Sequence, residues 1–327
     1  MDDQPQCQGW QGEVNEEVQT MWGDKRYHTW NYHLRETFGT KIFKLPLDAG
    51  FTCPNRDGQI SRTGCIYCSS RGSGDFAGNA NFNLELQYEQ TKEMMHKKWP
   101  NANYIAYFQA FTNTYAPIDQ LRSAYEQALS FPGVVGLSIA TRPDCLADDV
   151  LDLLSEINQR TYLWVELGLQ TIHNHTAELI NRGHSYETFL NGLYKLQARQ
   201  IRTCTHIIYG LPHETTEEMI QTADCVSQLP IQGIKIHLLH ILKYTPLAEY
   251  YATNPFPLMD KDSYVKIVVD TLERLPKDVV IHRLTGDGPR DLLIAPMWSL
   301  KKWELLNAFD HELQRRSTEQ GAKFSVK

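Results

Sequence analysis

The chain has 327 residues, of which 42% are hydrophobic and 22% are charged, proportions that are ordinary for a globular enzyme. It contains no apolar run near the roughly 18 residues that a membrane span requires and no secretory signal, so we expect a cytoplasmic protein with no membrane partner. The net charge of −7 weighs at first against a nucleic-acid partner.

The negative charge is concentrated at the N-terminus. Residues 1–24 contain six acidic side chains and no Lys or Arg, so they carry −6 of the total of −7 and leave the rest of the chain near −1. We therefore expect residues 1–27 to form an acidic, partly disordered arm. The last fifty residues are locally basic. Charge alone thus leaves the partner open.

Strand-like and helix-like segments alternate from residue 40 to about residue 245, which is typical of βαβ units and a parallel sheet. The expected fold class is α/β, a partial (β/α)6 parallel barrel over residues 28–245. We expect residues 246–327 to form a C-terminal α/β extension that caps the cavity or contacts substrate. The expected strands are Lys41–Leu47, Tyr104–Phe111, Val134–Ala140, Tyr162–Gln170, Arg202–Tyr209 and Gly233–Ile241, and the expected helices cover about 84–98, 118–130, 147–159, 173–181, 186–199 and 215–228.

Polar and apolar residues alternate on three of the expected strands. Successive side chains of a strand point to opposite faces, so the polar residues of each strand share one face. Burying such groups unpaired is costly, and their convergence inside a barrel indicates a ligand cavity at the carboxyl ends of the strands. The inward residues are Ser138 and Arg142 with the third strand, Glu166 and Gln170 on the fourth, and Lys235 and His237 on the sixth.

Three cysteines, Cys53, Cys65 and Cys68, follow the first expected strand. Three thiolates can hold three corners of a 4Fe–4S cluster, which four cysteines ordinarily hold, and thus leave one iron with an open coordination position. A structural zinc site is the alternative, but the nearest further ligands, His96 and Cys145, form no second ligand pair. A disulfide framework is disfavoured because the chain has seven cysteines, an odd number, and no secretory signal.

The cysteine spacing C-x11-C-x2-C begins a series of seven sequence blocks that resemble radical S-adenosylmethionine enzymes of the YhcC/YtqA family. The chain is more distantly similar to the radical domain of the Elongator catalytic subunit. The resemblance covers residues 28–300 and implies two cofactors, a 4Fe–4S cluster and S-adenosylmethionine. The other blocks are YFQAFTNTYAP at 107–117, SIATRPD at 138–144, ELGLQT at 166–171, NRGH at 181–184, GLPHET at 210–215 and HLLHILKYTPL at 237–247.

The resemblance implies a role for individual residues of these blocks, and the strand period already places several of them in the cavity. The three cysteines are the implied ligands of the cluster. The implied contacts with S-adenosylmethionine are Tyr67 and Leu211 for the adenine, Gln109, Thr112 or Asn113 for the methionine amine, Ser138 and Arg142 for the methionine or ribose, Glu166 and Gln170 for the ribose hydroxyls, and Arg182 for the methionine carboxylate.

Simpler explanations stay open for several of these residues. Tyr67 would then serve only in packing, Arg142 would close a turn by pairing with an aspartate, and Arg182 would be a solvated surface arginine. The Gly72–Gly78 segment lacks the spacing of a dinucleotide fingerprint and is interpreted as a flexible cover over the cluster. Residues 285–290 would form either a phosphate cradle or an ordinary surface turn.

The family resemblance implies a radical enzyme that cleaves S-adenosylmethionine to a 5′-deoxyadenosyl radical. The substrate it implies is tRNA, at the step from carboxymethylaminomethyluridine to aminomethyluridine in the wobble position. The implied partners are tRNA and an electron donor such as flavodoxin or ferredoxin. Two alternatives are a radical enzyme acting on a small metabolite or protein side chain, and a non-catalytic iron–sulfur or zinc protein. The candidate substrate contacts are Lys235, His237, Arg283 and Arg290.

Overall fold

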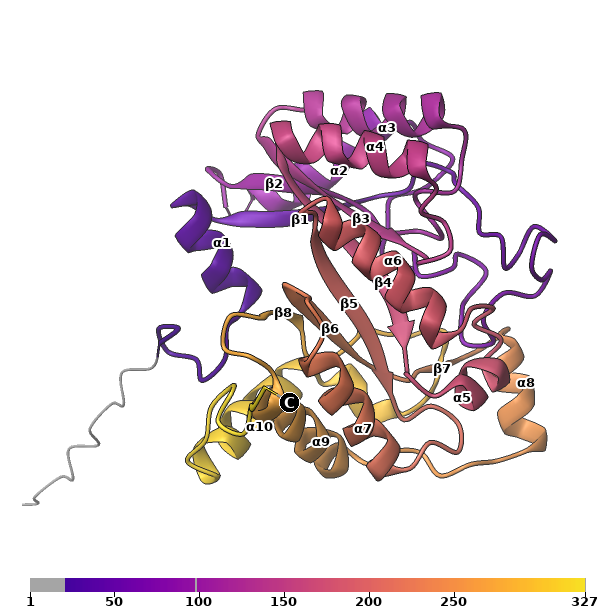
Figure 1. The fold of residues 1–327 in the computed structure, drawn as a ribbon, viewed down its shortest axis with the longest axis vertical. Helices are drawn as coiled ribbons and strands as arrows, with labels where there is room; N and C mark the ends of the chain where they lie inside the picture. The colour runs from indigo at the N-terminus through magenta and orange to yellow at the C-terminus, as the bar shows by residue number, and fades with distance from the viewer. Residues whose placement is uncertain (1–20, 98, 327) are drawn as a thin grey trace, which may run out of the picture.

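Seven parallel strands form one curved sheet in the computed structural model, which describes residues 21–97 and 99–326 (Figure 1). The strand order β1-β2-β3-β4-β5-β6-β8 follows the chain, and the sheet ends at β1 and β8. This confirms the expected α/β partial barrel. The strands of the sheet are β1 Ile42–Leu47, β2 Asn103–Phe108, β3 Val134–Thr141, β4 Tyr162–Gln170, β5 Arg202–Tyr209, β6 Gly233–Leu238 and β8 Val280–Arg283, while β7 Ile241–Leu242 pairs antiparallel with β9 Leu293–Ala295.

Helices between the strands cover the outer face of the sheet (Figure 1). Short polar side chains begin several of them: Asn83, Ser185 and Thr215 each accept a backbone N–H of the first turn. None of the helices within the described ranges is long and apolar enough to cross a bilayer. The helices are α1 Trp30–Phe38, α2 Leu84–His96, α3 Ile118–Ser130, α4 Asp148–Arg160, α5 Asn174–Leu179, α6 Tyr186–Ala198, α7 Thr216–Ser227, α8 Pro246–Thr253, α9 Lys261–Arg274, α10 Lys302–Arg315 and the 3₁₀ turn η1 Met297–Leu300.

The two faces of the sheet differ in character, as the alternation in the sequence predicted. On β4, Leu163, Val165 and Leu167 are fully buried in the main hydrophobic core under the helices. The opposite face of the same strand carries Glu166, which is also buried but lies among charged side chains. The outer face therefore supplies the stability of the fold, and the inner face is free to carry chemistry.

The sheet has one strand more than the six expected from the sequence. Strand β8 pairs in parallel with β6, with Gly233 opposite Val280 and Ile234 opposite Ile281. It has only four residues, too few to show a strand period in the sequence. The C-terminal region therefore supplies one strand of the barrel wall. Its remaining segments lie around the barrel.

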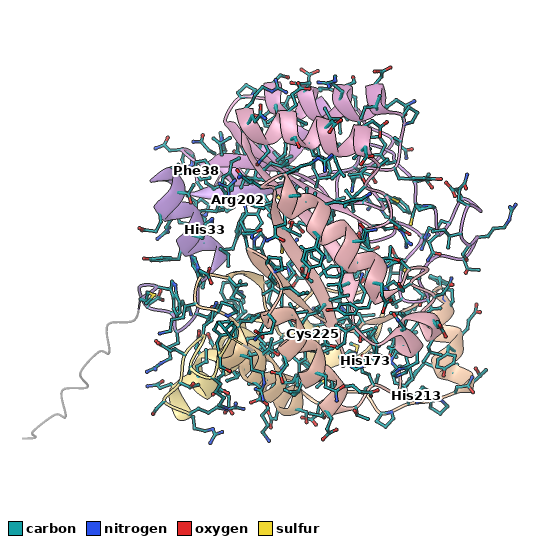
Figure 2. The ribbon with its side chains drawn as sticks, viewed as in Figure 1. His33, Phe38, His173, Arg202, His213 and Cys225 are labelled. Atoms are coloured by element: carbon teal, nitrogen blue, oxygen red, sulfur yellow. The ribbon has the colours of Figure 1, made fainter. Side chains whose placement is uncertain are left out.

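Helix α1 covers the amino-terminal end of the barrel and was not expected from the sequence. Figure 2 labels His33 and Phe38 on this helix, close to Arg202 at the start of β5. His33 Nε2 lies 2.6 Å from the Tyr162 hydroxyl, and the Phe38 and Tyr162 rings meet edge-on with centroids 5.1 Å apart. The Arg202 guanidinium lies 4.7 Å from the centroid of the same tyrosine ring. These contacts hold α1 against the first residues of β4 and β5.

The short segment before α1 packs on the C-terminal part of the chain. Trp22 and Tyr27 are buried. The backbone carbonyl of Arg26 accepts the N–H of Gln320 at 2.9 Å. Residues 21–27, at the end of the predicted acidic arm, thus belong to the folded body. Residues 1–20 of that predicted arm lie outside the described residues.

Candidate functional site

A cavity of about 280 Å³ opens at the carboxyl ends of the strands, beside the cysteine loop. This is the end at which parallel barrels carry their sites. The cavity brings together residues that lie far apart in the sequence. Those predicted for the site that line it are Cys53, Cys65, Tyr67, Cys68, Gln109, Thr112, Arg142, Glu166, Gln170, Arg182, Lys235, His237 and Arg283.

The cysteine loop is held against the segment that follows α5. Asn55 Nδ2 donates to the backbone carbonyl of Asn181 at 2.6 Å and lies 3.7 Å from Cys65 Sγ. In return, Asn181 Nδ2 donates to the backbone carbonyl of Gly64 at 2.7 Å. Gly64 has a φ of 74°, which favours glycine directly before the second cysteine. Two asparagines therefore fix the position of the loop.

The donor set at the loop fits a cluster with one open corner. Cys53, Cys65 and Cys68 are half-buried and line the cavity, whereas the remaining described cysteines are absent from its lining. Among the described residues that line the cavity there is no fourth cysteine, so three thiols would hold three irons and leave the fourth iron open.

The end of β4 presents two buried polar atoms that have no protein partner. Gln170 has a φ of 68°, and its Oε1 accepts no hydrogen bond. Arg182 is buried, with Nε donating to the His184 carbonyl at 2.9 Å and Nη1 to the Thr171 carbonyl at 2.6 Å, while Nη2 has no acceptor. Unmade hydrogen bonds of buried groups are costly. A ligand with hydroxyl donors and a carboxylate acceptor, such as S-adenosylmethionine, would satisfy both atoms.

An ion-pair network occupies the deeper part of the cavity. Glu166 is 1% exposed and forms salt bridges with both Lys44 and Lys235. Its Oε2 lies 2.8 Å from His206 Nε2, and its Oε1 accepts from Ser138 Oγ at 2.6 Å. The carboxylate is therefore satisfied within the protein, and a ribose contact by Glu166 would have to replace one of these partners.

The charges in this network are set by burial and by their neighbours. Burial acts to raise the pKa of the Glu166 carboxyl, but Lys235, Lys44 and His206 outweigh it and hold that pKa well below its usual range. Burial lowers the pKa of Lys235 to about 7, although the Glu166 carboxylate opposes this shift. Burial, with Lys235 nearby, also lowers the pKa of His206 to about 4. His206 is thus neutral near pH 7.

Four of the predicted contacts do not line the cavity. The Asn113 side-chain amide donates to two backbone carbonyls, and the Asn113 backbone carbonyl accepts from the Tyr125 hydroxyl. Ser138 donates to Glu166. Leu211 packs in a small hydrophobic cluster, and Arg290 is exposed at the surface. The contacts of these four residues with cofactor or substrate stay predictions, and the sequence could not show which of their groups already have partners.

Two other predicted residues line the cavity but are already engaged. Arg142 holds Asp144 through two hydrogen bonds of 2.9 and 2.6 Å, which is the local turn considered as its alternative. Gln109 Nε2 donates to the Ser73 carbonyl at 2.7 Å, and Ser73 Oγ donates back to the Gln109 carbonyl at 2.9 Å. Gln109 thus ties the glycine-rich segment to the edge of the cavity.

Two cavity residues, His206 and Tyr107, and their neighbour Lys44 were not predicted from the sequence. Lys44 and His206 both contact Glu166, and the ring of Tyr107 lies 4.7 Å from Lys44 Nζ and 4.4 Å from Lys235 Nζ. The strand period would have placed Lys44 and His206 on the inner faces of the first and fifth expected strands. Tyr107 gave no such indication, because tyrosine is common on both faces of a sheet.

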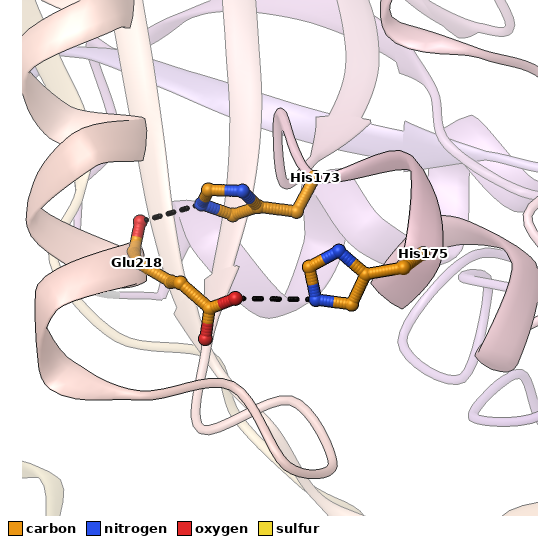
Figure 3. A group of neighbouring side chains, drawn as sticks. All are labelled: His173, His175 and Glu218. Carbon is orange, nitrogen blue, oxygen red and sulfur yellow. Dashed lines mark hydrogen bonds and ion pairs between the residues drawn. The ribbon is translucent and has the colours of Figure 1, made fainter.

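A second group of ligand-type side chains lies outside the cavity, between α5 and α7 (Figure 3). His173, His175 and Glu218 place one ligand atom each within 4.8 Å of one another. His173 Nε2 lies 3.0 Å from the Glu218 backbone carbonyl, and His175 Nε2 lies 3.2 Å from its carboxylate. The carboxylate also accepts the backbone N–H of Thr215 at 2.8 Å in the capping box of α7. These hydrogen bonds account for the group without a metal ion.

Comparison with known proteins agrees with this geometry. Residues 53–226 match the Radical SAM superfamily, and residues 231–315 match the Radical_SAM C-terminal domain. The chain belongs to the radical SAM superfamily. It is 55% identical to YtqA of Bacillus subtilis over 92% of this chain and 94% of that protein, which confirms the predicted YhcC/YtqA family. The cofactors of the superfamily are a 4Fe–4S cluster and S-adenosylmethionine.

More distant similarities extend to radical SAM proteins with other domains. The solved structure of archaeal Elp3 from Methanocaldococcus infernus shares the fold, with a TM-score of 0.64 and 15% identity over 86% of this chain and 64% of that chain. The tRNA uridine(34) acetyltransferase of the same organism is 26% identical over 49% of this chain and 30% of that protein. This radical SAM enzyme therefore corresponds to only part of each of those two proteins.

Proposed function

We propose that this radical SAM enzyme modifies tRNA at the wobble uridine, in the step from carboxymethylaminomethyluridine to aminomethyluridine. The observation that carries the proposal is the cavity, which has three cluster thiols at its mouth and a cationic, polar floor. A relative named as a tRNA uridine(34) acetyltransferase supports the choice of nucleotide. We further propose that the enzyme works in the cytoplasm with flavodoxin or ferredoxin as its electron donor.

Different residues of the cavity would bind the cluster and orient the cofactor. When bound, the cluster and S-adenosylmethionine supply one-electron cleavage and hydrogen abstraction through the 5′-deoxyadenosyl radical. Cys53, Cys65 and Cys68 would hold the cluster. Arg182 Nη2 and Gln170 Oε1, the two atoms without protein partners, would orient the cofactor at the end of β4.

The cavity also has the means to protect a reactive site from water. The glycine-rich segment forms part of its wall through Gly72, Ser73 and Phe76, and two hydrogen bonds between Ser73 and Gln109 hold that segment in place. Deeper inside, Glu166 fixes Lys44 and Lys235, so the floor is ordered before substrate arrives. Preorganised polar groups of this kind act without rearranging during reaction.

The proposal is tested by comparing modified nucleosides in tRNA from cells with and without the gene. We expect loss of the gene to increase carboxymethylaminomethyluridine and to remove aminomethyluridine and the nucleosides made from it. A plasmid carrying the wild-type gene should restore the profile, whereas the Cys65→Ser variant should not. An unchanged wobble-uridine profile would contradict the tRNA substrate and favour a small metabolite or protein side chain.

A further inference from the structure

The cavity contains one guanidinium group that has no partner. Arg56, Arg142, Arg182 and Arg283 all line it, and the first three donate hydrogen bonds to protein oxygens. Within residues 21–97 and 99–326, Arg283 makes neither a hydrogen bond nor an ion pair with a carboxylate. Arg283 is half-buried and lines the cavity, so its guanidinium donors are free to bind a ligand there.

The sheet register directs Arg283 into the cavity. It is the last residue of β8 and lies opposite Lys235 of β6. Residues opposite each other on neighbouring strands share a face, and Lys235 points inward to Glu166 and to the Tyr107 hydroxyl, which it meets at 3.0 Å. The positive charge of Arg283 also acts on Lys235, Tyr107 and His237. Arg283 thus belongs to the floor of the cavity.

The charge balance around Arg283 is positive. Glu166 is the only carboxylate of the floor and is already bound by Lys44 and Lys235. The two other acidic residues that line the cavity are satisfied elsewhere, since Asp75 accepts from Ser69 Oγ at 2.7 Å and Asp287 pairs with Lys302 at 2.7 Å. The floor therefore has cationic charge to spare for one anionic group.

A second group without a partner lies next to Arg283. His237 Nε2 is buried and makes no hydrogen bond, and burial, reinforced by His206 and Arg283, holds the pKa of His237 well below its usual value. His237 is therefore neutral and offers one N–H donor. Arg283 and His237 together supply a planar donor fork and a further donor, which match the oxygens of a carboxylate.

We propose that Arg283, with His237 beside it, binds a carboxylate carried by the substrate and selects substrates that bear one. This rests on the proposed function, in which the substrate uridine ends in a carboxymethyl group. The site lies on the floor of a cavity of about 280 Å³, so the carboxylate must be the terminus of a thin side chain.

Binding experiments with the S-adenosylmethionine-loaded, anaerobic enzyme test this directly. The probes are two anticodon stem-loops whose wobble uridine carries either the carboxymethylaminomethyl group or its neutral carboxamide. We expect the wild-type enzyme to bind the carboxylate form about tenfold or more tightly. In the Arg283→Gln variant this preference should disappear, and Arg283→Lys should retain part of it. Equal affinity of the wild-type enzyme for both probes would overturn the proposal, as would an unchanged preference in Arg283→Gln.

The controls separate this role from a structural one. Arg290→Gln removes an exposed arginine of the same region and should leave the preference intact. Arg283→Gln should keep the iron content, the affinity for S-adenosylmethionine and the thermal midpoint of the wild type, because Arg283 has no protein partner to lose. If the tRNA of cells that lack the gene is unchanged, the proposed function fails. If the nucleoside profile changes on loss of the gene, and the Arg283→Gln gene restores it as fully as the wild-type gene, the proposed function stands and only the carboxylate site is contradicted.

Discussion

The amide nitrogen of Gln170 lies 2.9 Å from the point that a Cβ on Gly168 would occupy. Gly168 thus leaves room for the Gln170 side chain to lie along the cavity wall. We expect Gly168→Ala to displace the amide and lower the affinity for S-adenosylmethionine about tenfold, with little loss of stability, because the displaced group is the end of a flexible side chain. Equilibrium binding of S-adenosylmethionine to the anaerobically reconstituted protein measures this.

The matched control is Gly136→Ala on the neighbouring strand. There a Cβ would lie 2.2 Å from the backbone carbonyl oxygen of Tyr162, which cannot move without disturbing the sheet. We expect that variant to lower the thermal midpoint strongly. A Gly168→Ala protein with wild-type affinity for S-adenosylmethionine would contradict the role given to Gln170.

Replacing Glu166 should lower the free energy of unfolding by more than replacing an exposed glutamate does. In Glu166→Gln, the buried Lys235 and the half-buried Lys44 would be left without a carboxylate, which costs about 3–5 kcal/mol of unfolding free energy. Glu156→Gln, which removes an exposed pair with Arg122, should cost no more than about 1 kcal/mol. Denaturant unfolding measures the unfolding free energy that each variant loses. Similar losses in the two variants would contradict the stabilising role of the network around Glu166.

A half-buried carboxyl group outside the cavity should make stability depend on pH. Glu214 accepts the Thr171 hydroxyl at 2.5 Å, and burial raises the pKa of its carboxyl to about 7. The folded protein therefore keeps this proton up to about pH 7, whereas the unfolded chain loses it near the usual pKa of 4.5. The stability that this group contributes is present in full below that lower pKa and is lost as the pH rises to about 7.

The Glu214→Gln variant isolates this contribution. Relative to the variant, the wild type should lose up to roughly 3 kcal/mol of unfolding free energy between those two pH values. Thermal midpoints of both proteins, measured across the upper part of this range, would show the difference. Parallel pH profiles would mean that Glu214 is ionised in the folded protein.

The cysteines offer a test of the cluster that does not depend on substrate. We expect Cys53→Ser, Cys65→Ser and Cys68→Ser each to lose most of the iron and sulfide that the wild-type protein binds on anaerobic reconstitution. Cys204→Ser is the control, because Cys204 is fully buried and does not line the cavity. Equal loss of iron in that variant would show a general effect on folding.

The inner face of the sheet was predictable because it follows from a local period. Glu166, Lys235 and His237 were placed in the cavity by alternation along their own strands, and all three line it. The same rule would have found Lys44 and His206. The face on which each of these side chains lies is determined by alternation within its own strand. Long, regular strands can be recognised from the sequence.

Positions set by distant pairing were not predictable. Arg283 was named as a substrate contact without a place in the fold, and its position on the cavity wall depends on the pairing of β8 with β6. Asn113 and Leu211 were expected at the cofactor, but their side chains do not line the cavity. A motif shows which residue types occur together, whereas the partners each side chain already has emerge only in three dimensions.

The contacts between the two ends of the described chain have a consequence for biosynthesis. Thr29 bridges to Ile281 of β8, and Arg26 is hydrogen-bonded to Gln320, so residues translated early are held by residues translated much later. A nascent polypeptide cannot form these contacts until residues 281–320 have been translated. Ribosome stalling before that point would thus leave Trp22 and Tyr27 uncovered and accessible to chaperones.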